Sequence, residues 1–118
     1  MSQSAEKTIY TLSQLGESLK RTLERVTEGR PLWFKAEISK LTTGPTGHVY
    51  LDLVEEKEGR RLAVMRGTLW RGQADAVKAK LGDSADQILQ AGSEIVFSGR
   101  INYHAVFGVS LVLSLIHI

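Results

Sequence analysis

The chain has 118 residues, enough for one domain with a sizeable buried core, and its 15 Lys and Arg against 13 Asp and Glu give a formal net charge of +2. The absence of Cys excludes disulfide frameworks, thiolate zinc sites and cysteine nucleophiles. The N-terminus lacks the apolar segment of a signal peptide and the longest apolar-rich run, 106–118, is shorter than a membrane span of about 20 residues, so we expect a cytoplasmic domain without membrane contact.

The first eight residues, 1–8, are polar, and we expect them to be disordered. A helix packed on the rest of the domain is predicted over 9–29. Thr11 and Gln14 have the spacing of a capping box, and Gly29 is a typical stop. The helix should bury one stripe of apolar side chains, which recur at intervals of three and four: Leu12, Leu15, Leu19, Leu23 and Val26.

The opposite face of this helix carries three basic side chains that could reach a polyanion: Lys20, Arg21 and Arg25. Three acidic side chains accompany them: Glu17, Glu24 and Glu28. An ordinary solvent-exposed face is therefore the simpler interpretation.

Residues 32–54 contain two alternating stretches separated by the turn sequence Gly-Pro-Thr-Gly at 44–47. The apolar side chains of each stretch share one face, which predicts an antiparallel hairpin with one buried face. The other face carries charged and aromatic groups, and we expect the function there: Trp33, Lys35, Lys40, His48 and Tyr50.

A third strand is expected over 62–71, with a bulge or tight bend at Gly67, where the alternation changes phase. Helical spacing follows over 73–81 and a loop over 83–92. Two further strands, 94–103 and 107–116, are joined by a short turn near His104. The three Phe side chains share the parity of aliphatic neighbours and are assigned to the core: Phe34, Phe97 and Phe107.

The order of elements predicts a mainly β fold, namely the five-stranded Greek-key OB-fold barrel with an N-terminal helix and a helix between strands 3 and 4. The barrel domain is assigned to 30–118. Another five-stranded barrel or a split α+β sheet is the alternative.

Five blocks in order between 9 and 116 resemble the N-terminal domain of the exodeoxyribonuclease VII large subunit. They are Tyr10-Thr11-Leu12-Ser13-Gln14-Leu15, Trp33-Phe34-Lys35-Ala36-Glu37-Ile38-Ser39, Gly47-His48-Val49-Tyr50-Leu51-Asp52-Leu53, Gly67-Thr68-Leu69-Trp70-Arg71, and Gly99-Arg100-Ile101 with Tyr103, Gly108 and Ser110-Leu111. The resemblance implies an OB-fold that binds single-stranded DNA (ssDNA), joined to a nuclease region that works with a small-subunit partner in DNA breakdown and repair in the bacterial cytoplasm.

The chain departs from this family at Ala36 and Lys40, where the family often has Gly and Asn. It stops where the family continues into a coiled-coil and catalytic region. We therefore expect a domain fragment on which no catalytic residue of the family can be placed.

Binding of ssDNA without sequence preference requires cations for phosphates and flat side chains for bases, each stacked base contributing roughly 1–3 kcal/mol. Trp33 is a secondary candidate, which could instead lie under the N-terminal helix with Glu37. Trp70 could instead close the barrel, and His48 could bond a nearby backbone group. The candidate binding residues are Lys35, Lys40, His48, Tyr50, Arg66, Trp70, Arg71, Arg100 and Tyr103.

The sequence predicts no catalytic residue, metal ligand or cofactor site. Two clusters contain the residue types of an active site but not its spacing. Asp52, Glu55 and Lys57 resemble the residues of a metal-dependent nuclease, and Ser39, His48 and Asp52 those of a catalytic triad. The three His lack zinc-ligand spacing. The alternative function is a protein-interaction module whose exposed strand Val109 to Ile116 pairs with another chain, including a homodimer.

Overall fold

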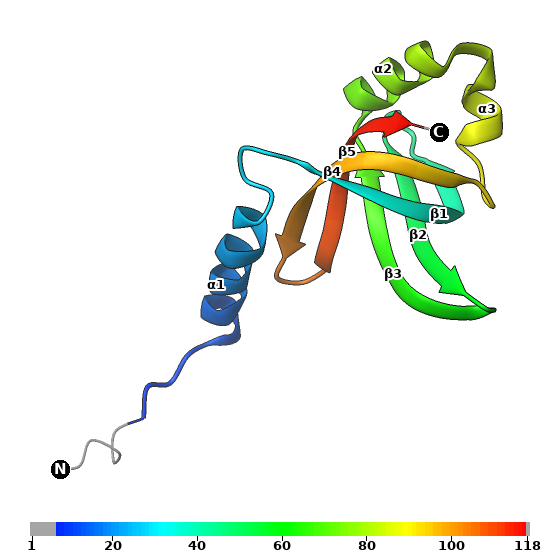
Figure 1. The fold of residues 1–118 in the computed structure, drawn as a ribbon. Helices are drawn as coiled ribbons and strands as arrows, with labels where there is room; N and C mark the ends of the chain where they lie inside the picture. Colours follow the sequence, from blue (N-terminus) through cyan, green and yellow to red (C-terminus); the bar gives the residue numbers. More distant parts are fainter. Residues whose placement is uncertain (1–6, 118) are drawn as a thin grey trace.

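The structure is a computed structural model that describes residues 7–117, so most of the segment 1–8 for which disorder was expected lies outside it (Figure 1). The elements are α1 (Leu12–Arg25), β1 (Leu32–Thr43), β2 (Val49–Lys57), β3 (Arg60–Leu69), α2 (Arg71–Leu81), the 3-10 turn η2 (Gly82–Ser84), α3 (Ala85–Ile88), β4 (Glu94–His104) and β5 (Gly108–His117). The predicted order of elements is confirmed, and the expected loop over 83–92 contains the short α3.

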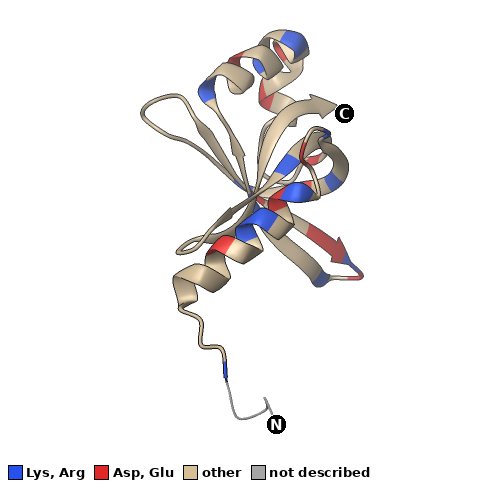
Figure 2. Ribbon diagram, turned by 90° about the vertical axis from the view of Figure 1, so that its left-hand side faces the viewer, with Lys and Arg blue, Asp and Glu red and all other residues tan. Residues whose placement is uncertain are grey.

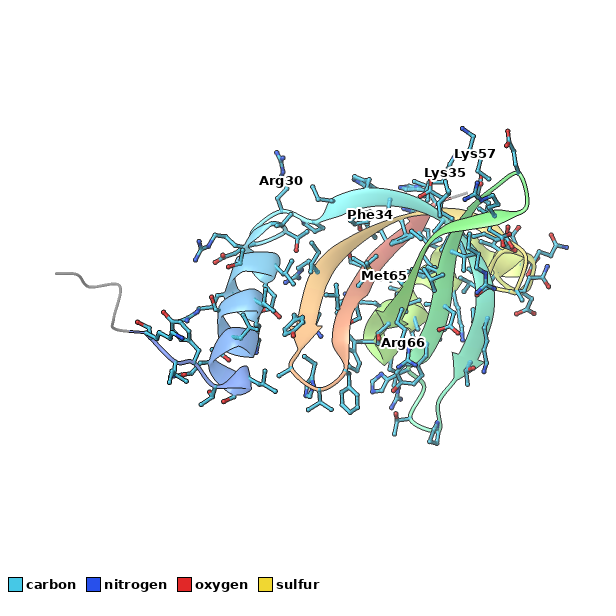
Figure 3. The ribbon with its side chains drawn as sticks, turned by 90° about the horizontal axis from the view of Figure 1, so that it is seen from below. Arg30, Phe34, Lys35, Lys57, Met65 and Arg66 are labelled. Atoms are coloured by element: carbon cyan, nitrogen blue, oxygen red, sulfur yellow. The ribbon has the colours of Figure 1, made fainter. Side chains whose placement is uncertain are left out.

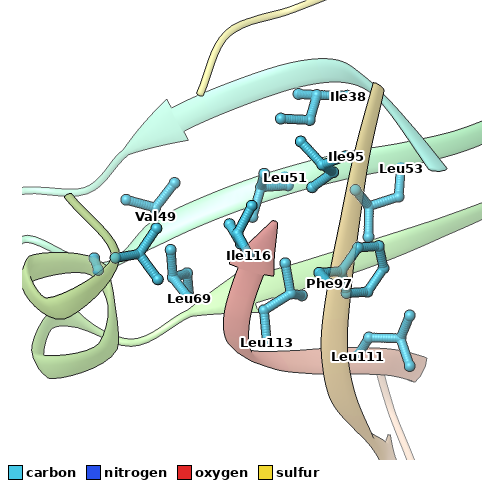
Figure 4. Close-up of a cluster of buried hydrophobic side chains, with 12 residues drawn as sticks. Ile38, Val49, Leu51, Leu53, Leu69, Ile95, Phe97, Leu111, Leu113 and Ile116 are labelled. Carbon is cyan, nitrogen blue, oxygen red and sulfur yellow. The ribbon is translucent and has the colours of Figure 1, made fainter. Parts of the chain in front are cut away.

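The five strands form a closed barrel in the order β1-β2-β3-β5-β4. All neighbours are antiparallel except β3 and β5, whose parallel pairing closes the barrel. This confirms the predicted OB-fold. Ala74 and Val77 of α2 belong to the same core cluster. The inward-facing strand residues, labelled in Figure 4, are Ile38, Val49, Leu51, Leu53, Leu69, Ile95, Phe97, Leu111, Leu113 and Ile116.

Of the two alternatives predicted at Gly67, a bulge or a tight bend, the bulge is wrong. Gly67 pairs regularly with Leu51 on β2 and with Leu111 on β5, and the bulge of β3 lies instead opposite Glu55 and Glu56. From Ala63 to Leu69 the strand keeps one phase, with Gly67 and Leu69 facing inward. The apparent change of phase arose because apolar Leu62 and Val64 lie on the outer face, where both are exposed.

The start of α1 agrees with the sequence. Thr11 Oγ1 accepts a hydrogen bond from Gln14 N at 3.1 Å, and Gln14 Oε1 accepts one from Thr11 N at 2.8 Å, which completes the predicted capping box. The apolar stripe is less buried than its pattern indicates. Leu12 is 87% exposed, and Leu15, Leu19 and Val26 are also exposed.

α1 contacts the β4–β5 hairpin at buried Gly16, where an added Cβ would lie 3.1 Å from Ala105 Cβ, and again at the end of the helix and the turn that follows it. β1 pairs with β4 only as far as Gly99. Beyond that point the N–H of Ile101 donates to Thr27 Oγ1 at 2.9 Å, and the N–H of Tyr103 donates to Glu24 Oε2 at 3.3 Å. The end of α1 therefore replaces β1 along β4, and the helix stands beside the β4–β5 hairpin (Figure 1).

One of the three core assignments for Phe is wrong. Phe97 is buried and its ring stacks on Phe34 with centroids 5.6 Å apart, as expected. Phe107 is 77% exposed, because it lies in the β4–β5 turn just before β5 begins at Gly108. Its ring lies 4.7 Å from the ring of His104.

Part of the last strand, which the alternative function uses as a free edge, has both of its backbone edges occupied. β5 pairs with β4 along its length and with β3 over Ser110–Val112. Its central part therefore has both backbone edges occupied. Within residues 7–117, no helix has the length and apolar character needed to cross a membrane.

Candidate nucleic-acid interface

Two rows of side chains cross the outer face of the barrel. Residues paired in register on neighbouring strands project from the same side of a sheet. In this barrel the side chains at the alternate positions of each strand face the core. The first row runs through Thr42, Tyr50, Thr68, Val112 and Arg100. The second row runs through Lys40, Asp52, Arg66, Ser110 and Asn102.

A cleft of about 240 Å³ lies over β1, β2 and β3 on this outer face. Tyr50, which is 46% exposed, lines it with Lys40, Asp52 and Arg66. Within residues 7–117 the single ion pair shorter than 4.0 Å joins Arg61 to Glu56 at the far end of the β2–β3 hairpin. Lys40 and Arg66 therefore flank Asp52 without an ion-pair contact and can bind an external anion.

A second and larger cleft, of about 650 Å³, lies between α1 and the outer face of β4 and β5. Arg100 and Val112 of the first row lie in it, and Trp70, which is 47% exposed, forms part of its lining. Arg21 and Arg25 reach it from α1. The cleft thus combines three guanidinium groups with an accessible indole.

His48 ties the β1–β2 loop to the start of α2. Its Nδ1 accepts a hydrogen bond from the N–H of Arg71 at 2.8 Å, and its ring meets the ring of Trp70 edge-on with centroids 4.9 Å apart. At Gly47, with φ +92°, a Cβ would come within 3.1 Å of the Arg71 side chain. His48 therefore positions Trp70 and Arg71.

The structure does not bring Lys35 to these clefts. Lys35 lies at another end of the barrel, near Lys57 and away from Arg66 (Figure 3). The cleft around Lys35 is also lined by four acids: Glu37, Glu55, Glu56 and Glu94. Lys35 and Lys40 both face outward, because the bulge of β1 between Ile38 and Lys40 offsets their odd spacing. The first half of β1 pairs with β4 rather than β2, so Lys35 lies away from the cleft that Lys40 lines.

Tyr103 and Trp33 are also set apart from the two rows. Tyr103 pairs with Val109 and shares the parity of Ile101, which packs against the core, so it projects on the side opposite to Arg100. Trp33 is half-exposed, and its ring lies 5.0 Å from the ring of His117. Neither residue lines the two clefts.

The two enzyme-like clusters do not form a site. Ser39 Oγ donates to the backbone carbonyl oxygen of Asp52 at 3.1 Å, while His48 Nδ1 is occupied by the N–H of Arg71. No group of three or more His, Asp or Glu side chains within the described part of the chain is arranged to hold a metal ion.

Sequence reasoning gave too little weight to one contribution to this surface, the basic pair Arg21 and Arg25. It raised contact with a polyanion but favoured an ordinary solvent-exposed face. Only the docking of α1 on β4 shows that both line a cleft.

Comparison with known proteins agrees with this geometry. A family model described as an OB-fold nucleic acid binding domain matches residues 10–117. Exodeoxyribonuclease 7 large subunits of Yersinia pseudotuberculosis and Yersinia pestis are each 35% identical over 68 residues, which are 58% of this chain and 14% of the length of those relatives. These matches confirm the resemblance noted in the five sequence blocks. The crystal structure of the SSB domain of a Synechococcus protein has a TM-score of 0.48 at 14% identity, covering 75% of this chain and 93% of that chain.

Proposed function

The chain belongs to the family of OB-fold nucleic acid binding domains, and on this premise we propose that it holds ssDNA for an exodeoxyribonuclease VII large subunit. The observation that carries the proposal is the outer face of β1, β2 and β3. There Lys40 and Arg66, both without an ion-pair partner within 4.0 Å among the described residues, lie in one cleft with the exposed ring of Tyr50. OB-folds bind oligonucleotides on the face of strands 2 and 3 and on the loops beside it.

Each side chain in this cleft has a separate task. Lys40 and Arg66 neutralise phosphates, which makes binding favourable and dependent on salt. Tyr50 offers a face on which a base can stack, and stacking accepts every base because each has a π-face. Thr42 and Thr68 add hydroxyl groups to the same cleft. The arrangement favours binding without sequence preference, and none of these interactions requires a cofactor.

The wider role follows from the similarity to the Yersinia relatives. In this role the domain presents single strands to a nuclease region of the same large subunit, which acts with the small subunit in DNA breakdown and repair in the cytoplasm. The matched segment covers 14% of the length of those relatives, and we place no catalytic residue on this barrel face.

Titration with a fluorescent oligo-dT at several salt concentrations tests the proposal. Replacing Lys40→Ala and Arg66→Ala together should weaken binding and reduce the slope of log K against log[salt] by about 1.4, that is, about 0.7 for each lost phosphate contact. The matched control is Lys57→Ala with Arg60→Ala, which removes the same charge at the far end of the β2–β3 hairpin. Equal slopes for the two double variants would refute the placement of DNA on this face.

A second candidate function, association through a free strand edge, has support at β3. β3 pairs with β5 over Arg66–Thr68 only, while Arg60–Met65 pairs with β2. Leu62 and Val64 are exposed in this segment. Edge addition there would produce concentration-dependent dimers in sedimentation experiments that Leu62→Lys abolishes without loss of oligo-dT binding.

A further inference from the structure

We propose that α1 forms the second wall of an extended ssDNA path, in which Arg21 and Arg25 bind phosphates of a strand segment that continues past β3 over β5 and β4. The inference rests on the proposed function and adds a binding site on a helix outside the barrel. The ligand class is the sugar-phosphate backbone of a single strand.

The cleft between α1 and the barrel has the dimensions and lining of a binding site. Its volume of about 650 Å³ falls in the range of roughly 300–1,000 Å³ that is common for ligand sites. The floor is formed by Arg100, Asn102 and Val112 of the outer rows, and one wall by Trp70. The opposite wall is α1.

The position of α1 aims its basic residues at this cleft. Arg21 and Arg25 are four residues apart, so they share one face of the helix. Glu24 and Thr27 fasten this end of the helix to the backbone of β4, the strand that carries Arg100. Figure 2 shows the basic residues of α1 gathered toward the end of the helix that lies at the barrel.

The charges of the cleft favour an anion. Arg21, Arg25 and Arg100 line it, and within residues 7–117 none of them makes an ion pair shorter than 4.0 Å. Two acids, Glu24 and Glu28, also line the cleft, so three guanidinium groups stand against two carboxylates and one positive charge is in excess. The hydrogen bond from Tyr103 N to Glu24 orients that carboxylate without removing its charge. Phosphate groups would supply the partners that the guanidinium groups lack.

The second cleft continues from the first without leaving the outer face. The first row passes from Tyr50 through Thr68 and Val112 to Arg100, and Trp70 follows Thr68 by two residues. The row crosses four inter-strand spacings from β1 to β4, roughly 19 Å in total at about 4.8 Å each. A short oligonucleotide can occupy the first cleft alone, whereas a longer one reaches α1.

The test compares two oligo-dT lengths, about 6 and about 16 nucleotides, which bracket the range of site sizes known for OB-folds. The variant Arg21→Ala with Arg25→Ala should weaken binding of the long probe roughly tenfold at low salt and lower its salt slope by about 1.4. Binding of the short probe should not change. The control is Lys20→Ala with Arg30→Ala, which removes two exposed cations that do not line the cleft.

The outcomes separate this inference from the proposed function. If Arg21→Ala with Arg25→Ala has no effect on either probe while Lys40→Ala with Arg66→Ala weakens both, the α1 wall is refuted and the barrel site stands. If Lys40→Ala with Arg66→Ala has no effect on either probe, the proposed function itself fails. If Lys20→Ala with Arg30→Ala weakens binding of the long probe equally, the effect comes from net charge, and the α1 wall is also refuted.

Discussion

Gly67 shows how a single missing side chain allows this barrel to close. The residue is buried where β3 is paired on both sides, and a Cβ there would lie 2.8 Å from Leu113 Cδ1 and 2.9 Å from Leu53 Cδ1. Both atoms belong to packed core side chains. The core therefore reaches the backbone of β3, and the first parallel pairs between β3 and β5 form at this point.

Replacing Gly67→Ala should lower the free energy of unfolding by about 1–3 kcal/mol, because Leu53 and Leu113 must leave their positions to admit the new methyl group. Urea denaturation followed by circular dichroism measures the change. Gly72→Ala is the control. At Gly72 no atom lies within 4 Å of the added Cβ, and alanine favours the helix in which it stands, so stability should not fall.

The two tryptophans differ in their relation to the clefts. Trp70 lines the cleft beside α1, whereas Trp33 packs its ring beside His117. In the single-tryptophan variant Trp33→Phe, the remaining Trp70 fluorescence should be quenched by oligo-dT because a base stacks on or near the indole. In Trp70→Phe, the emission of Trp33 should respond weakly. The reverse order of responses would contradict the assigned face.

At the scale of elements, α1 is held on β4 by hydrogen bonds at its end as well as by packing. Thr27 is 1% exposed and accepts from the backbone N–H of Ile101, while Leu12 and Leu15 remain exposed. A backbone N–H at an unpaired strand edge needs an acceptor, and here a side chain after the helix supplies it. Hydrogen bonds at the end of α1 and the close approach of Gly16 to Ala105 together hold the helix on the β4–β5 hairpin.

Thr27→Val preserves the shape of the side chain and removes the acceptor of the Ile101 N–H. We expect a loss of about 1–3 kcal/mol in stability, since the N–H is left unsatisfied at a buried position. Amide hydrogen exchange should accelerate at Ile101 and Tyr103 and remain slow at the β2–β3 pairs. Thr22→Val, an exposed site on α1, is the matched control, and equal acceleration there would disprove the docking role of Thr27.

At the scale of the whole molecule, the arrangement of charge is more informative than its sum. A formal net charge of +2 is weak support for binding nucleic acid. The fold gathers three cations on one outer face: Lys40, Arg66 and Arg100. Acidic side chains gather instead around Lys35, at another end of the barrel. This separation gives the molecule a basic path despite its nearly balanced composition.

Much of the architecture could be predicted from local patterns. The capping box at Thr11, the turn at Gly44 and Gly47 and the alternation on β1 and β2 all depend on neighbours in sequence, so they could be recognised before the structure was known. The same patterns predicted the outward position of Tyr50. They could not predict that β3 would leave Leu62 and Val64 exposed, because alternation does not show which face a strand buries.

The sequence by itself determined the order of helices and strands, the inward parity of most core residues and the family, since these depend on local periodicity and short blocks. The tertiary structure decided which cations share a surface. It separated Lys35 from Lys40, because the first half of β1 pairs with β4, and it brought Arg21 to the cleft by docking α1 on β4. The physical reason is that barrel closure and helix docking join residues far apart in sequence, and no local pattern carries their relative positions.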